Sequence, residues 1–191
     1  VAGLFVVLFR PFRVGDLIKV GTNRGFIEDI TLRHTVIRNF NNERIVIPNS
    51  SISSDTILNS TIDDPKICSH LELGISYNSD LEHAIDIIRE ESMKHPNIID
   101  NRTEEEIAEG VPEVIIRVMA WQDSSILLRA YLWSEDPIAG FVMRTDLLRT
   151  LKHRFDEEGI EIPFPHRTVY MRQEQPFGVH NTEGSADELI D

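Results

Sequence analysis

The sequence predicts an α+β protein of two domains, in which an all-β domain of short strands precedes an α/β domain. Two patterns indicate this order. Short runs of alternating apolar and polar residues, separated by Gly, Asn and Pro, follow one another through residues 14–66. From residue 67 onward the strand-like runs alternate with two longer stretches whose apolar residues repeat every three to four positions, as in amphipathic helices. A chain of 191 residues has room for one or two domains of this kind.

The first thirteen residues differ from the rest of the chain. Residues 1–9 are almost wholly apolar, and Arg10 and Arg13 come soon after them. The apolar run is too short to span a bilayer, which takes about 20 residues. An apolar run followed by arginines is typical of the cytoplasmic exit of a membrane segment, and we expect residues 1–13 to be the end of such a segment in a longer protein. The alternative is a buried element of a water-soluble domain, and composition alone does not choose between them.

Residues 14–66 are expected to form a small barrel or sandwich of five short strands. Asn41 and Asn42 favour a hairpin turn, because Asn tolerates positive φ. Pro48 ends the fourth strand, because it cannot donate a ladder hydrogen bond. Residues 49–55 are polar and Ser-rich, as in a loop or a single helical turn. The expected strands are residues 16–20, 26–32, 35–40, 44–47 and 56–62.

Residues 67–172 are expected to form an α/β sandwich. Ser79, with Glu82 three residues later, predicts a capping box at the start of the first helix. Asp136-Pro137 marks the start of the second helix and Gly159 its end. The expected strands are residues 67–75, 113–121, 125–134 and 168–171. The resulting order, β-α-β-β-α-β, is the ferredoxin-like pattern.

Charge is unevenly distributed along the chain. The formal net charge of −13 is made up of +1 in residues 1–66, −9 in residues 67–172 and −5 in residues 173–191. A near-neutral N-terminal part can lie close to anionic lipid, whereas an acidic C-terminal part is repelled from it. The overall charge argues against sequence-independent binding to nucleic acid, which needs a basic surface. The tail from residue 173 has little apolar content and is expected to be disordered.

The sequence holds no arrangement typical of an active site. Its seven His residues are scattered, Cys68 has no second Cys with which to bind zinc, and the G-x-S-x-G, P-loop and G-x-G-x-x-G motifs are missing. We therefore predict no enzyme activity, no catalytic residue, no cofactor and no metal. Two alternatives stay open beside a structural or transport role. One is an RNA-binding protein, which the charge disfavours, in which Trp121, Tyr131 and Trp133 would stack on bases instead of packing the sandwich or a subunit interface. The other is an enzyme, because a ferredoxin-like fold also supports enzymes.

Four motifs, in this order, resemble signatures of the small-conductance mechanosensitive ion channel family. FRPFRVGD at residues 9–16 resembles the junction between the pore-lining helix and the barrel, and IVIPNS at residues 45–50 resembles the barrel signature. GISYNSD at residues 74–80 resembles the start of the α/β domain, and FDEEGIEIPFP at residues 155–165 resembles the C-terminal signature. The resemblance covers roughly residues 1–172. One departure is residues 133–144, which differ from the best-known members.

The resemblance implies a fold and an assembly. The first domain is expected to be a small Sm-like β-barrel, the second a ferredoxin-like α/β domain, and the last strand part of an oligomeric β-barrel. The family implies a homo-oligomer, usually a heptamer, of a tension-gated channel that releases ions and small osmolytes on hypo-osmotic stress. This region is expected on the cytoplasmic side of the inner (plasma) membrane, as a cage below the pore. The constriction and the tension-sensing helices lie upstream of residue 1 in this comparison.

The resemblance also assigns roles to particular residues. The domain bounds are residues 1–13 for the end of the pore helix, 14–66 for the barrel and 67–172 for the α/β domain with its last strand. The arginines are expected either to meet lipid phosphates or to pair with acidic groups such as Asp16, and acids of the cage either to favour cations mildly or to be solvated surface. The pore-helix end and lipid-proximal residues are Phe9, Arg10, Pro11, Phe12 and Arg13; the barrel signature is Ile47, Pro48 and Asn49; and the oligomeric terminal strand is Thr168, Val169, Tyr170 and Met171.

Overall fold

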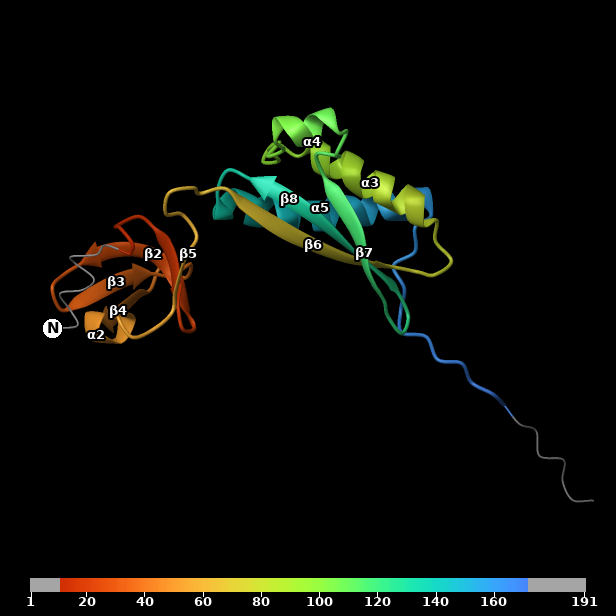
Figure 1. Ribbon diagram of the computed structural model, residues 1–191. Coiled ribbons are helices and arrows are strands. Elements are labelled where there is room, and N and C mark those ends of the chain that lie inside the picture. Colours follow the sequence, from red (N-terminus) through yellow and green to blue (C-terminus); the bar gives the residue numbers. More distant parts are fainter. Residues whose placement is uncertain (1–10, 172–191) are drawn as a thin grey trace, which may run out of the picture.

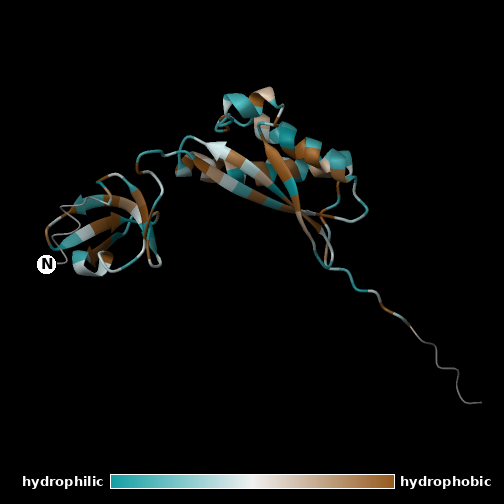
Figure 2. Cartoon of the chain, viewed as in Figure 1, coloured by the Kyte–Doolittle hydropathy of each residue, from teal (hydrophilic) through white to brown (hydrophobic). Residues whose placement is uncertain are grey.

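The computed structural model describes residues 11–171 of the chain. It contains two domains, each with its own hydrophobic core (Figure 1). The segment between them, residues 60–66, is largely hydrophilic, whereas hydrophobic residues concentrate along the strands and helices (Figure 2). The predictions for residues 1–10 and for the tail beyond residue 171 lie outside the described part.

The first domain is a five-stranded antiparallel sheet in the order β4-β3-β2-β1-β5. The strands are β1 (Leu17–Val20), β2 (Asn23–Ile30), β3 (His34–Arg38), β4 (Arg44–Pro48) and β5 (Ile57–Asn59), with one helical turn, α2 (Asn49–Ile52), after β4. Gly25 lets β2 approach β3, because a Cβ there would lie 2.3 Å from the Arg38 carbonyl oxygen. Asn42 has φ of 64°, which confirms the predicted hairpin turn.

The five predicted strands and the helical turn are therefore confirmed, but the sheet is not hydrogen-bonded into a closed cylinder. Within residues 11–171 the outer strands β4 and β5 pair only with β3 and β1 respectively. β5 has only three residues, and its edge that faces away from β1 has no strand partner in this part of the chain. The sheet nevertheless surrounds one apolar core, made of Phe12, Ile18, Val20, Ile27, Ile37 and Ile52.

The second domain is a three-stranded antiparallel sheet, in the order β6-β8-β7, with helices on one face. Its elements are β6 (Ile67–Ile75), α3 (Leu81–Lys94), α4 (Glu104–Ala108), β7 (Ile115–Trp121), β8 (Ile126–Ser134) and α5 (Pro137–Glu158). Every second residue of β8 is buried, so one face of this strand forms the floor of the core. Leu128, Ala130 and Leu132 pack there against residues of α3 and α5.

The helix ends follow the sequence with one correction. Asp136 accepts hydrogen bonds from the N–H groups of Ile138 and Ala139, and Gly159 closes α5 with φ of 74°, both as predicted. The cap of α3 is Asp80 and not Ser79, because the Asp80 carboxylate accepts the N–H of His83. The Ser79 hydroxyl instead accepts the N–H of Glu161, which arrives from the far end of α5.

The predicted fourth strand is not formed. Residues 168–171 have no strand partner, and the chain after α5 runs away from the sheet (Figure 1). Val169, Tyr170 and Met171 are 77%, 92% and 92% exposed. A strand forms only when a partner satisfies its backbone hydrogen bonds, and the chain's described residues supply none at this position. The α/β domain thus has the ferredoxin-like order up to α5, with a three-stranded sheet.

Candidate functional site

The junction between residue 11 and the barrel is a tight, hydrogen-bonded turn. The N–H of Arg13 donates to the Asp16 carboxylate (2.9 Å), and the N–H of Asp16 donates back to the Arg13 carbonyl (3.0 Å). Gly15, at φ of 96°, adopts the left-handed conformation that the turn requires. Asn59 on β5 donates to the same Asp16 carboxylate (2.8 Å) and to the Pro11 carbonyl (3.5 Å). The direction in which the chain enters the barrel is therefore fixed by two elements far apart in sequence.

Phe12 was expected to lie near lipid, and its position is a correction. Its side chain is 1% exposed and belongs to the barrel core, beside Ile18 and Ile52. The physical reason is that Pro11 and the turn at residues 13–16 point this side chain inward, where it gains more from burial than on the rim of a small domain. Phe12 therefore fastens the junction to the barrel.

Of the other four junction residues, Pro11 and Arg13 lie within the part of the chain that the structure describes. Arg13 is exposed, and its contact with Asp16 runs through its backbone N–H and not through its guanidinium. Pro11 is half-buried. Phe9 and Arg10 lie outside the described residues, so their predicted roles stay predictions.

The barrel signature surrounds one buried polar side chain. Asn49 is fully buried and sits at the start of α2. It donates to the Thr31 carbonyl (2.8 Å) and accepts from the Thr35 hydroxyl (2.8 Å), so it ties α2 to β3 and to the turn before it. Ile47 packs against the core, and Pro48 ends β4 as predicted. The signature residues therefore hold the barrel together and offer no reactive group.

Charged side chains lie across the outside of the β2-β3-β4 sheet. The Arg44 guanidinium donates two hydrogen bonds, of 2.9 and 3.1 Å, to the Glu28 carboxylate. The Arg38 Nε lies 3.8 Å from a Glu28 carboxylate oxygen. The hydrogen bond from Arg44 is the main reason why the pKa of Glu28 is lowered. All three groups are solvent-exposed, so this cluster fixes orientation and contributes little to stability.

A second ionic cluster, which the sequence did not reveal, joins α3 to α5. Arg154 donates to Glu91 (2.6 Å) and Glu90 (3.3 Å) of α3 and to Glu158 one turn further along α5 (2.6 Å). These carboxylates, Glu158 foremost, raise the pKa of Arg154. The i,i+4 spacing of Arg154 and Glu158 was the available signal, but the partners on α3 depend on how the helices pack.

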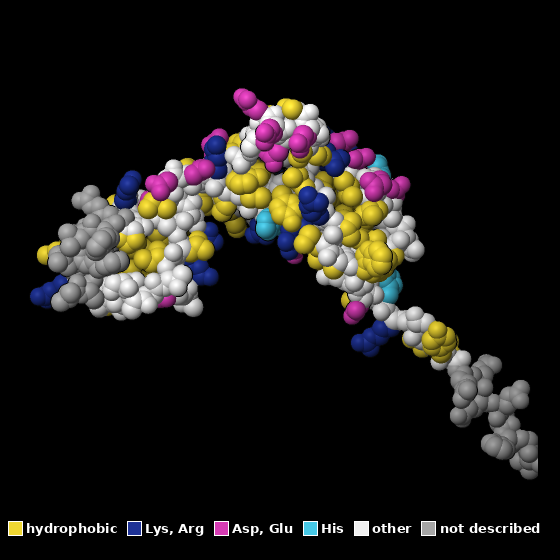
Figure 3. Space-filling model, viewed as in Figure 1, with side chains coloured by type: hydrophobic (Ala, Val, Ile, Leu, Met, Phe, Trp, Pro, Cys, Tyr) yellow, Lys and Arg dark blue, Asp and Glu magenta, His cyan; other side chains and the backbone are white. Residues whose placement is uncertain are grey.

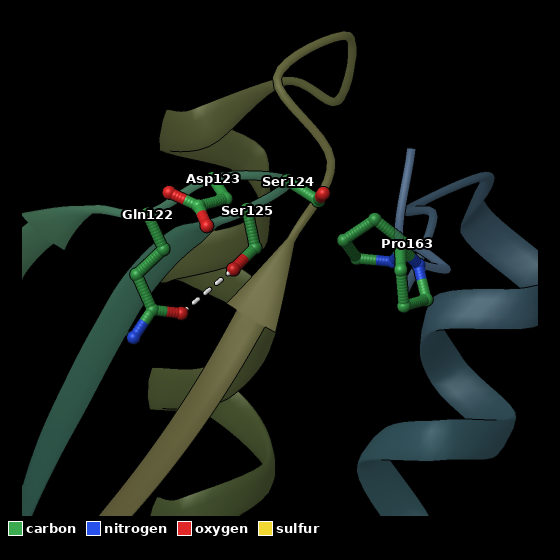
Figure 4. Close-up of a pocket in the computed structure, with 6 residues that line it drawn as sticks. Gln122, Asp123, Ser124, Ser125 and Pro163 are labelled. Carbon is green, nitrogen blue, oxygen red and sulfur yellow. Dashed lines mark hydrogen bonds between the residues drawn. The ribbon is translucent and has the colours of Figure 1, made fainter. Parts of the chain in front are cut away.

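The segment after α5 is anchored to the α/β domain at two points before it leaves. The backbone of Glu161 bonds to Ser76 (2.9 Å) and to the Ser79 hydroxyl (3.0 Å). The N–H of His166 donates to the hydroxyl of Ser124 (3.0 Å), in the turn between β7 and β8. Figure 4 shows this turn facing the chain at Pro163 across a shallow pocket. Residues 168–171 therefore leave from a fixed place at one end of the sheet.

Neither a metal centre nor a membrane span is found in the described part of the chain. Within residues 11–171 no three His, Cys, Asp or Glu side chains are grouped as metal ligands. Over the same residues, none of the helices combines the length and the apolar character needed to cross a bilayer. The geometry is thus that of two packed domains, a fixed N-terminal junction and exposed strand edges.

Two family models match nearly all of this architecture. The mechanosensitive ion channel beta-domain matches residues 1–62, and the C-terminal domain of the mechanosensitive ion channel MscS matches residues 70–162. The chain is 28% identical over 183 residues to an uncharacterized MscS family protein of Archaeoglobus fulgidus, covering 96% of this chain and 60% of that protein. It is 28% identical to the small-conductance mechanosensitive channel MscMJ of Methanocaldococcus jannaschii, covering 91% of this chain and 47% of that one.

Solved structures agree with the fold. The closed-state crystal structure of Helicobacter pylori MscS superposes with a TM-score of 0.78 at 22% identity, over 91% of this chain and 64% of that one. The β domain followed by this α/β domain is the pair of domains that the two mechanosensitive ion channel family models describe. The chain belongs to the MscS family of these membrane channels, and it spans about half to three fifths of the length of the relatives named above.

Proposed function

We propose that this chain is the cytoplasmic, ring-forming part of a tension-gated ion channel that releases ions and small osmolytes under hypo-osmotic stress. The observation that carries the proposal is the junction, because Phe12 and Asp16 fix the start of the barrel directly after the apolar residues 1–9. A chain end held in this way transmits the position of a preceding membrane helix to the barrel. The proposal assigns the chain a conducting role and no chemical reaction.

The barrel supports assembly into a ring. Its outer strands β4 and β5 present unpaired edges in the described single chain, and unpaired edges are templates for pairing with another chain. Each edge also carries an exposed apolar residue, Val46 at 60% and Leu58 at 55% exposure. Two different edges that meet head to tail form a heterologous interface, which closes into a ring if the rotation fits. We propose a ring of about seven copies, the usual number in this family.

The terminal segment supports a second contact between copies. Val169, Tyr170 and Met171 are almost fully exposed, although burying such side chains is favourable. The anchors at Glu161 and His166 hold this segment at the same place in every copy. We propose that residues 168–171 of neighbouring copies pair into a narrow barrel at the base of the cage.

The charge distribution supports the orientation. The front of the chain is near neutral and has an exposed Arg13 at the junction, whereas residues 67–172 carry −9. We propose that Arg13 faces lipid headgroups, with the acidic α/β domain further from the membrane on the cytoplasmic side. Acidic residues that line a vestibule raise the local cation concentration, which predicts a mild cation preference.

A cross-linking experiment tests the ring. In a Cys68→Ser background of the complete channel, Val46→Cys and Leu58→Cys place thiols on the two barrel edges. Oxidation should give a ladder of covalent oligomers that ends at about seven subunits on a denaturing gel. The control pair, Val46→Cys with Leu32→Cys, uses an equally exposed apolar residue in the β2-β3 turn and should give no ladder.

Patch-clamp recording of the complete channel tests the activity. Membrane tension should open conducting events, and bi-ionic reversal potentials should report the mild cation preference. A protein that stays silent up to membrane rupture contradicts the channel proposal, while a clear anion preference contradicts only the role of the acidic vestibule.

A further inference from the structure

An apolar groove lies between the barrel and the first turns of α5. Its volume is about 670 Å³, within the range of about 300–1,000 Å³ that small-molecule sites occupy. Phe141 is 58% exposed in this single chain, and Ile138 and Val142 beside it are 42% and 40% exposed. The lining residues are Leu17, Arg24 and Phe40 from the barrel and Pro137, Ile138, Phe141 and Val142 from α5. Figure 3 shows the recess between the two domains, with hydrophobic and basic side chains on its barrel side.

A polar pocket of about 280 Å³ continues this groove over the edge of the barrel. The two pockets share Arg24 and Phe40 in their linings, so they lie next to one another. Four uncharged side chains that can form hydrogen bonds line the polar pocket, and one of them, Asn39, already donates to the Glu43 carboxylate. They are Thr22, Asn23, Asn39 and Asn41, with Ile45 as the apolar member of the lining. The combined site is apolar at one end and polar at the other.

The charge at the meeting point is positive. Arg24 on β2 lies directly opposite Lys19 on β1 in the antiparallel ladder, so both side chains leave the same face of the hairpin. Like charges in directly opposite positions destabilise a sheet. Among residues 11–171 neither side chain has an ion-pair partner, whereas the nearby Arg44 and Arg38 both approach Glu28. An anion bound at Arg24 would relieve this repulsion.

We propose that this site binds an anionic single-chain amphiphile, specifically a long-chain fatty acid. The alkyl chain lies in the groove against Ile138, Phe141 and Val142. When it binds, the apolar surface of these side chains is removed from contact with water. The carboxylate lies at Arg24, at the mouth of the polar pocket. A neutral alcohol of the same length lacks the charge, and a short-chain acid lacks the apolar contact, so both bind more weakly. The inference does not depend on channel activity.

Isothermal titration calorimetry with dodecanoate, below its micelle concentration, tests the proposal on the purified chain. Affinity should rise about twofold to fourfold for each methylene added between octanoate and dodecanoate, because a fully buried methylene contributes about fourfold. Dodecanol should bind at least threefold more weakly than dodecanoate, the upper range of an exposed ion pair being about fivefold.

Two variants and their matched controls locate the ligand. Phe141→Ala should weaken dodecanoate binding at least tenfold, while Leu148→Ala, which removes a 43% exposed apolar side chain from the same helix outside the groove, should not change it. Arg24→Gln should weaken binding threefold to fivefold and abolish the preference over dodecanol. Arg33 is an exposed arginine outside both pockets, so Arg33→Gln should change neither the affinity for dodecanoate nor the preference over dodecanol.

Three outcomes overturn the proposal. Dodecanoate fails to bind, or it binds equally well to the Phe141→Ala variant, or dodecanol matches it in the unmodified protein. Light scattering of the same samples covers the remaining alternative. Suppose that Phe141→Ala lowers the mass of the assembly and that dodecanoate does not bind to the unmodified protein. A second copy of the chain then covers the groove, and the fatty-acid assignment is wrong.

Discussion

Replacing Phe12 by Ala should unfold or severely loosen the barrel. Phe12 is 1% exposed and packs among five buried aliphatic side chains of a domain of about fifty residues. Removing a buried phenylalanine costs about 3–5 kcal/mol, since both the transfer free energy and the packing around the cavity are lost. A change of this size raises the unfolded fraction roughly 150- to 5,000-fold, which is comparable to the whole stability of a small domain.

Amide hydrogen exchange is the suitable assay, because both tryptophans, Trp121 and Trp133, belong to the α/β domain and fluorescence does not report on the barrel. Amides of β2 and β3 should lose protection in the Phe12→Ala variant, while those of β6 and β8 keep theirs. Phe40→Ala is the control, as Phe40 belongs to the same domain and is 59% exposed. Equal loss of protection in the two variants would refute the placement of Phe12 in the core.

Three further predictions test other contacts. Asn49→Ala should destabilise the barrel by about 1–3 kcal/mol in urea titrations followed by hydrogen exchange, because it leaves the buried Thr35 hydroxyl without its acceptor and the part-buried Thr31 carbonyl without its donor. Gly140→Ala should lower the thermal midpoint of the α/β domain despite the better helix propensity of Ala, since the new Cβ would lie 2.6 and 2.7 Å from two serine hydroxyls of β6 and β8. The pKa of Asp100, lowered to about 2 mainly by the side-chain hydrogen bond from Arg102, should return towards its ordinary value in Arg102→Gln when carboxyl resonances are titrated by NMR. Because this pKa is depressed in the folded state, the contact stabilises the fold above about pH 4 and is lost as the pH falls through about 2.

Most of the fold was readable from local patterns. Alternation of apolar residues predicted β6 and β8 because each buries one face, and their burial patterns match that alternation at Leu71 and Leu128. The Asp136-Pro137 start and the Gly159 end of α5 were predictable because capping depends on side chains within a few residues of the helix end. The cap of α3 was misassigned by one residue, since Ser79 and Asp80 are both good caps and only the approach of Glu161 decides between them.

The site was less predictable, because its contacts join residues far apart in sequence. The motif at residues 9–16 identified the junction, but no local pattern tells whether Phe12 faces lipid or the barrel core, since both environments favour a phenylalanine. The pairing of Asp16 with Asn59 spans 43 positions, and that of Arg154 with Glu91 spans 63. The groove between Arg24 and Phe141 likewise depends on how the two domains sit relative to one another.

The two mismatches in strand structure share one feature. The barrel has free edges at β4 and β5, and residues 168–171 have side chains suited to a strand but no partner within the described chain. In both places the sequence pattern indicates pairing, whereas one copy of the chain offers none. A strand whose partner belongs to another molecule carries the same alternation and β-branched residues as one paired internally, because these features describe a side chain on a pleated surface and not the origin of its neighbour. Exposed edges that keep a strand-forming sequence are costly unless they are covered. Their presence in both domains is therefore best explained by pairing between copies, and the cross-linking ladder through Val46 and Leu58 is the measurement on which that explanation depends.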